Sequence, residues 1–136
     1  MAVKITGEYI GSKKITLTHE LSGTQLTTSA PLDNQGDGKS FAPTDLVGAS
    51  LGACVLTIIA IIAERDGIDL SGMSMEVEKV MAQTPPRRIA ELNLLVRMPA
   101  RLSQEQRERF ERAAHGCPVH RSLHPDVRAP ISFEYV

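Results

Sequence analysis

The sequence predicts an α+β protein built around one long central helix that is buried on every face. Two observations lead to this prediction. The stretch from Leu46 to Ala63 has no charged residue, so no side of a helix there would favour water. Runs of alternating apolar and polar residues, typical of strands, lie on both sides of it. The predicted order is two or three strands, a helix, two strands, a helix and a last strand, in one domain over residues 1–136.

Composition narrows the class of protein. Hydrophobic residues make up 42% and charged residues 23% of the chain, which is typical of a soluble globular domain. A net charge of -1 favours neither nucleic-acid nor anionic-membrane binding. The chain has only 2 cysteines, too few for a secreted disulfide scaffold, and its start lacks the apolar core of a signal peptide. We therefore expect a cytoplasmic protein.

The first 30 residues alternate in a way that predicts strands in a meander. Val3, Ile5 and Tyr9 share one parity, and Ile15 and Leu17 alternate in the same way in the next run. A polar, glycine-rich loop follows at residues 33–40. It loosely resembles an anion- or calcium-binding loop, but it lacks the P-loop pattern and the closing Glu of an EF-hand, so we expect a flexible loop.

The long helix is expected to begin at Pro43 and to stop near Gly67. It has about the minimum length for a membrane span, but the rest of the chain is strand-rich and no flanking Lys/Arg cluster would set a topology. We therefore predict the core helix of a soluble protein. Its small residues, Gly48, Ala49, Gly52 and Ala53, would let another backbone approach closely. Because a domain of this size can hardly wrap one helix completely, we expect a homodimer that supplies the missing cover.

The second half is predicted to contain a hairpin with one buried face, with strands over residues 73–81 and 90–98. Ser103 to Gln106 has the form of a capping box that opens an amphipathic helix to about Ala114. Gly116 would stop that helix, and Pro118 could begin a further short one. Alternation over residues 131–135 predicts the last strand.

The two cysteines are the residues that could carry chemistry. A cysteine in a buried helix usually acts as a small hydrophobe, and this is the first interpretation of Cys54. Cys117 stands at a helix start, where unpaired N–H groups and the helix dipole favour a thiolate. His120 and Arg121 are close in sequence and could add to this effect.

A metal site is the alternative interpretation of this region. Cys117, His120 and His124, with His115 nearby, offer sulfur and nitrogen ligands. Their spacing matches no established zinc pattern, so metal binding stays the minority hypothesis.

Two motifs together resemble the OsmC-like family, which includes the organic hydroperoxide resistance proteins. They are FAPTDLVGASLGAC, from Phe41 to Cys54, and CPVHRSL, from Cys117 to Leu123. The resemblance extends over nearly the whole chain in element order. It implies an OsmC-like fold, in which antiparallel sheets of an intertwined homodimer wrap two central helices.

The resemblance also implies a chemistry. In the peroxidase members, the cysteine of the long helix attacks the hydroperoxide, and the second cysteine condenses with the resulting sulfenic acid to form a disulfide. A dithiol reductant then restores the pair. Cys54 and Cys117 match these positions. We therefore expect a thiol-dependent peroxidase that needs no cofactor or metal, and an apolar pocket would favour organic hydroperoxides over hydrogen peroxide.

The sequence departs from that family pattern in two places. The best-studied peroxidases have Glu after the Pro of the first motif, where this chain has Thr44, and they use an early Arg to hold the thiolate. Here no Arg precedes Arg65. The resemblance is therefore to a less characterised branch. The replacement cation could be Lys13 or Lys14 by position, or Arg87 or Arg88 from the hairpin turn.

These departures leave a second hypothesis open. The same fold could serve as a non-enzymatic or redox-sensing binding protein for a small apolar or thiol-bearing ligand, with the cysteines as sensors or inert residues.

Overall fold

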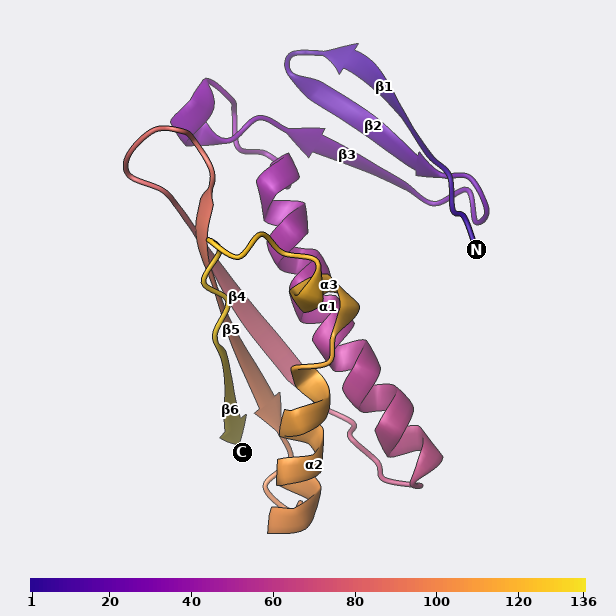
Figure 1. Cartoon of the computed structure of the whole chain (residues 1–136). Coiled ribbons are helices and arrows are strands. Elements are labelled where there is room, and N and C mark those ends of the chain that lie inside the picture. Colours follow the sequence, from indigo (N-terminus) through magenta and orange to yellow (C-terminus); the bar gives the residue numbers. More distant parts are fainter. The chain divides into compact units, whose positions relative to one another are not determined.

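The computed structural model describes residues 1–136 (Figure 1). The chain divides into two compact units, Met1–Val47 and Gly48–Val136, and the long helix contributes residues to both. The prediction of one domain stays a prediction, and each unit is described by itself.

The N-terminal unit contains a three-stranded antiparallel sheet in the order β1-β2-β3. Its strands are β1 (Ile5–Gly11), β2 (Lys14–His19) and β3 (Gln25–Ser29). In this sheet Tyr9 pairs with Ile15 and Gly7 pairs with Leu17, so the alternating apolar residues lie on one face. The predicted meander is confirmed.

The glycine-rich loop after β3 is held by specific contacts, whereas the sequence predicts a flexible loop. It begins with the short helix η1 (Leu32–Asn34). Lys14 Nζ forms an ion pair with Asp37 at 2.8 Å and also donates to Ser29 Oγ at 2.9 Å. A Cβ on Gly36 would lie 1.8 Å from the Ala30 carbonyl oxygen. The loop therefore packs so tightly on the preceding strand end that only glycine fits there.

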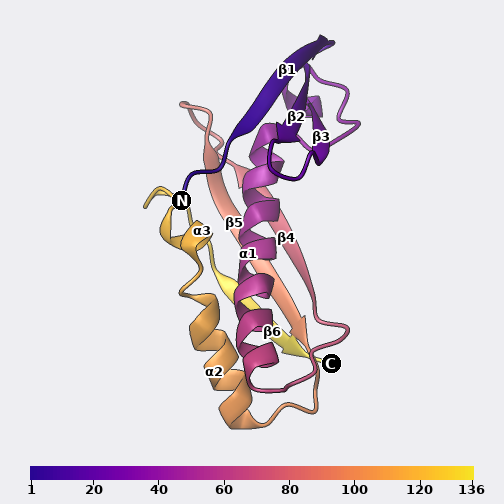
Figure 2. The same cartoon turned by 90° about the vertical axis from the view of Figure 1, so that its right-hand side faces the viewer.

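The C-terminal unit is a helix-covered sheet in the order β4-β5-β6. Its elements are α1 (Pro43–Arg65, which begins in the N-terminal unit), β4 (Ser74–Met81), β5 (Ile89–Met98), α2 (Gln104–Ala114), α3 (Pro118–Arg121) and β6 (Ile131–Tyr135). Strands β4 and β5 form the predicted antiparallel hairpin. Strand β6 runs parallel to β5, because the chain returns through α2 and α3 (Figure 2). The prediction of purely antiparallel sheets is therefore wrong for this sheet.

The predicted helix ends are present. Gly67 adopts a φ of 68° just after α1, a backbone conformation that ends helices and favours glycine. At the start of α2, Ser103 Oγ accepts a hydrogen bond from the Gln106 N–H at 3.1 Å, and Gln106 Oε1 accepts one from the Ser103 N–H at 2.9 Å. This is the predicted capping box.

The core of this unit lies between α1, α2 and one face of β5. Alternate residues of β5 are buried, while their neighbours are only half-buried. The fully buried side chains include Leu51, Val55 and Ile59 of α1, Leu92, Leu94, Val96 and Met98 of β5, and Phe110 of α2. Phe110 is the only aromatic residue among them, so the core is mainly aliphatic, as the composition predicts.

Helix α1 is buried on one face only. Its buried residues are Gly48, Leu51, Gly52, Val55, Ile59 and Ala63, a spacing of three and four that forms one stripe. Ala53, Thr57 and Ala60 are exposed, and Ile61 is 48% exposed. A single chain therefore does not bury this helix on every face, because the C-terminal unit has one sheet and two further helices with which to cover it. Burial of the remaining face by a second copy stays a prediction.

The small residues of α1 accept side chains rather than another backbone. A Cβ on Gly48 would lie 3.4 Å from Leu92 and 3.7 Å from Val77. A Cβ on Gly52 would lie 2.5 Å from Cε and 2.6 Å from Sδ of Met75. The glycines therefore bring the helix close to the sheet by making room for the side chains of β4 and β5.

This packing predicts an energetic coupling between Gly52 and Met75. Gly52→Val should lower the free energy of unfolding by about 1–3 kcal/mol, because the added side chain overpacks the contact. Adding Met75→Ala to Gly52→Val should cost less than Met75→Ala costs in the wild-type chain, with a coupling energy of about 0.5–3 kcal/mol. Urea denaturation of the wild type, the two single variants and the double variant measures their free energies of unfolding and hence the coupling energy. Strict additivity would show that the two residues do not share the space.

Candidate functional site

The structure brings Cys54 of α1 and Cys117 together, although the two residues are far apart in the chain. Cys54 lies one turn after the buried Leu51, and Cys117 is the N-cap residue of α3. Both are free thiols. The two side chains are neighbours, since a hydrogen bond with the Cys54 side chain is among the causes that raise the pKa of the Cys117 thiol.

The Cys117 thiol is fully buried, at 0% exposure. Burial raises its pKa above the ordinary value, and the hydrogen bond with Cys54 raises it further. The backbone N–H groups of His120 and Val119 act in the opposite direction, and the His120 N–H lies 3.4 Å from Sγ. The N–H groups at the helix start thus favour the thiolate as expected, but desolvation outweighs them. Cys117 is held as a neutral thiol.

The side chains next to Cys117 in sequence have other roles. His120 uses its imidazole Nε2 to donate to the Ala129 carbonyl oxygen at 3.0 Å, since a carbonyl can only accept. Arg121 is exposed and is not among the groups that act on the Cys117 thiol. The contribution of His120 to the thiol thus comes from its backbone, and the expected contribution of Arg121 is not found.

Cys54 lies at the border between the covered and the open faces of α1. It is half-buried, while its neighbour Ala53 and the residue one turn later, Thr57, are exposed. One side of Cys54 therefore faces Cys117 and the other opens toward the uncovered face of the helix. Of the two thiols, Cys54 is the one that a reagent from solution can reach.

The four candidate cations lie at or near the ends of strands. Two of them, Lys14 and Arg88, contact groups other than the cysteines. Lys13 is exposed in the β1–β2 turn, with a φ of 61°. Lys14 is paired with Asp37 and Ser29. Arg88 donates to the main-chain oxygens of Ile89 and Asp126, and Arg87 is exposed at the other hairpin turn.

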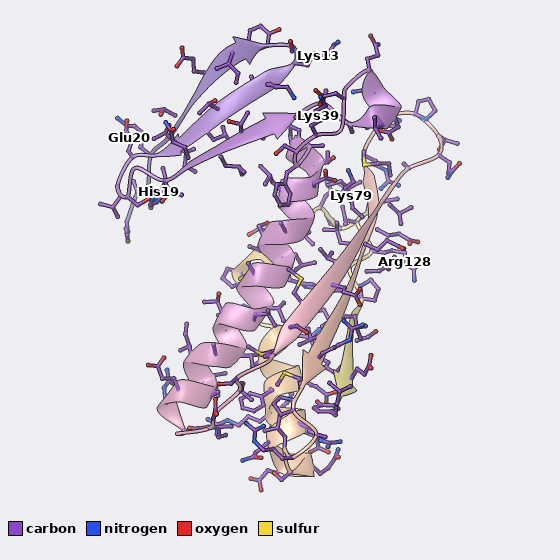
Figure 3. All side chains as sticks on the ribbon, turned by 180° about the vertical axis from the view of Figure 1, so that it is seen from behind. Lys13, His19, Glu20, Lys39, Lys79 and Arg128 are labelled. Atoms are coloured by element: carbon purple, nitrogen blue, oxygen red, sulfur yellow. The ribbon has the colours of Figure 1, made fainter.

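One further cation, Lys79, is missing from the set predicted from the sequence. This half-buried lysine of β4 pairs with the fully buried Leu92 of β5, so its side chain belongs to the sheet face that α1 covers (Figure 3). Lys79 has the same parity in β4 as Met75 and Val77, which the sequence places on the buried face of the hairpin. This alternation is the signal that could have identified Lys79 as a cation on the helix side.

The structure contains no group of three or more His, Cys, Asp or Glu residues that could hold a metal ion. His120 is bonded to Ala129, and its ring stands edge-on to His115 at 6.2 Å between centroids. His124 is exposed and accepts the Asp126 N–H at its Nδ1. The metal hypothesis for the histidines near Cys117 therefore finds no support.

The fold and the cysteine pair define a class of α+β proteins with two neighbouring thiols, one on a long core helix and one at a short helix start. The family described as OsmC-like protein matches residues 36–131. The chain belongs to the OsmC-like family, which includes the organic hydroperoxide resistance proteins. No curated protein matches the sequence.

Several solved structures share the fold over nearly the whole chain. A candidate osmotic stress induced and detoxification response protein from Psychrobacter arcticus is 38% identical, with a TM-score of 0.89 over 98% of this chain and 96% of that one. An organic hydroperoxide resistance protein OsmC from Legionella pneumophila is 22% identical, with a TM-score of 0.77 over 100% and 98% of the two chains. OhrB of Bacillus subtilis is 18% identical, with a TM-score of 0.72 over 98% of each chain.

These matches decide how α1 is interpreted. The helix is long and apolar enough to cross a membrane by length and composition alone. In the structure its glycine stripe packs on a sheet, and the same fold recurs over nearly the whole length of the Psychrobacter protein. The chain is a soluble OsmC-like protein, and α1 is its core helix.

The two environments predict different reactivity of the two thiols. At pH 7, iodoacetamide should label Cys54 at least about tenfold faster than Cys117, because alkylation requires an accessible thiolate. A raised pKa lowers the thiolate fraction at every pH below it, so Cys117 labelling should rise only at a more alkaline pH than that of an exposed cysteine. Peptide mass spectrometry over a pH series measures both rates. Equal rates at pH 7 would contradict the described burial.

Proposed function

We propose that the protein is a thiol-dependent peroxidase that reduces organic hydroperoxides. The observation that carries this proposal is the direct interaction of an accessible thiol, Cys54, with a buried neutral thiol, Cys117. A nucleophile that substrate can reach and a second thiol beside it are the two parts that a sulfenic acid and disulfide cycle requires.

Cys54 acts as the attacking thiol in this proposal. Its thiolate attacks the terminal oxygen of the hydroperoxide, the O–O bond breaks, and the alcohol leaves after taking a proton. Cys54 is thereby oxidised to a sulfenic acid. The buried residue Leu51 and the half-buried Ile58 lie one turn to either side of Cys54 on the helix. These apolar neighbours favour an alkyl or lipid-type hydroperoxide over hydrogen peroxide.

Cys117 acts as the resolving thiol. Its sulfur attacks the Cys54 sulfenic acid, the S–O bond breaks, and the Cys117 proton and the leaving hydroxide form water. A dithiol reductant then reduces the disulfide and is itself oxidised to a disulfide. The raised pKa of Cys117 suits this order, because the thiol stays protonated, and hence unreactive toward peroxide, until the sulfenic acid stands beside it.

We also propose that the active protein is a homodimer. The uncovered face of α1 includes Ile61, which is 48% exposed, and the apolar face of the N-terminal sheet includes Ile5 and Tyr9, which are 63% and 65% exposed. Apolar surfaces of this kind mark protein interfaces. Because Cys54 opens toward the same helix face, a second copy would cover Cys54 and supply a cation beside it.

A reducing compartment suits this chemistry. Both cysteines are free thiols, and such a pair persists where cellular reductants keep it reduced. We therefore place the protein in the cytoplasm, with a role against oxidative stress.

Turnover of cumene hydroperoxide with an excess of a dithiol reductant tests the enzymatic proposal. The wild-type protein should consume peroxide catalytically, and Cys54→Ser should reduce the rate by at least about 10³-fold, because the nucleophile is lost. Cys117→Ser should still give one fast turnover, with a trapped sulfenic acid. No turnover, or equal turnover in Cys54→Ser, would contradict the proposal, and a small ligand retained in native mass spectrometry would then favour a binding protein.

Sedimentation of the reduced protein tests the dimer. The wild-type chain should sediment as a dimer at ~10 µM, a concentration well above the Kd of a stable interface. Tyr9→Glu and Ile61→Glu should each shift the protein toward monomer, because a charge enters an apolar contact. The control is Thr6→Glu, an exposed residue of opposite parity on β1, which should leave the dimer intact. A wild-type monomer would refute the proposal.

A further inference from the structure

We infer that the groove between α3 and the segment leading into β6 is a binding site for a small carboxylate with an apolar body. The groove has a volume of about 420 Å³ and contains neither cysteine. It is lined by His120, Leu123, His124, Pro125, Val127, Arg128, Ala129 and Pro130. Volumes of this order hold small organic ligands.

The walls of the groove are fixed before any ligand arrives. The main-chain N–H of Arg128 donates to the Ala90 carbonyl at 3.0 Å, and its main-chain carbonyl accepts from the Leu92 N–H at 2.8 Å. Both main-chain groups of Arg128 are therefore bonded to β5. The Val127 N–H donates to the His124 carbonyl at 2.9 Å. Two prolines further restrict the segment. A preformed site of this kind loses little ordering entropy on binding.

Arg128 and two histidines are the titratable residues that line the groove, and no carboxylate is among the lining residues. The Arg128 side chain is 75% exposed and projects outward from the segment before β6 (Figure 3). Its one recorded ion pair joins Nη1 to Glu91 at 3.1 Å. A guanidinium has five N–H donors, so further donors can reach an anion.

His124 adds a hydrogen-bond donor of defined geometry. His124 accepts the Asp126 N–H at Nδ1, at 3.1 Å, so the neutral ring carries its proton on Nε2. Nε2–H is then a donor. The carboxylate of Asp126 lies 3.7 Å from the same Nδ1, on the side of the ring away from Nε2. Arg128 and His124 both line the groove, so each can donate to a carboxylate bound in it, and Leu123, Val127 and the prolines offer apolar contact to the rest of the molecule.

Benzoate is the probe for this site, and benzamide, which has the same shape but no charge, is its control. We expect benzoate to shift amide resonances of residues 123–130 of the ¹⁵N-labelled full-length protein saturably at pH 7. Its Kd should be at least about tenfold lower than that of benzamide, because charge-assisted hydrogen bonds are about twice as strong as neutral ones. Equal affinity, shifts centred on Cys54 instead, or no saturable shift by ~20 mM would overturn the inference.

Three variants separate binding from structure. Arg128→Gln should weaken benzoate binding about tenfold, whereas Arg121→Gln, an exposed arginine of α3 outside the groove, should leave it unchanged. Glu91→Gln removes the carboxylate that competes for Arg128, so benzoate should bind more tightly; a purely structural Arg128–Glu91 pair predicts no such gain. The measurement uses no peroxide, so its result is independent of the proposed peroxidase activity.

Discussion

The structure depends on how one helix, uncharged from Leu46 to Ala63, is covered. A single chain buries only the stripe of α1 that runs from Gly48 to Ala63, where glycines admit the side chains of β4 and β5. This packing sets the rotation of the helix about its axis. The rotation in turn places Cys54 at the border of the stripe, with Cys117 on one side and open surface on the other. The position of the reactive thiol is thus a consequence of core packing rather than of a separate catalytic loop.

The second cysteine illustrates a competition between two physical effects. A sulfur at a helix start receives backbone N–H groups, which favour a thiolate, and Cys117 receives them from His120 and Val119. Complete burial removes the sulfur from water, which favours the neutral thiol, and this effect is the larger. The outcome leaves Cys117 as a buried neutral thiol beside the more accessible Cys54, and this difference in exposure is what divides the roles of attack and resolution in the proposed cycle.

Much of the fold could be predicted because its signals are local. The capping box at Ser103, the glycine after Arg65 and the alternation of the β4–β5 hairpin each depend on a few neighbouring residues. The parallel pairing of β6 could not be predicted, since strand partners depend on the path of the chain through α2 and α3. The face of α1 that one chain covers could not be predicted either, because the uniform apolar composition of the helix does not distinguish one face from another. The cysteine pair was identified through family motifs, whereas the protonation of Cys117 required knowledge of its burial.

The most direct measurement of the central claim uses no reductant and a single equivalent of peroxide. Reduced protein is treated with one equivalent of cumene hydroperoxide, and thiol loss, the alcohol product and the disulfide linkage are quantified by peptide mapping. We predict that one equivalent of alcohol forms, that two thiols are lost per chain, and that Cys54 and Cys117 are joined by an intrachain disulfide. Retention of both thiols, or overoxidation of Cys54 to a sulfinic acid while Cys117 stays free, would contradict the proposed cooperation of the two cysteines.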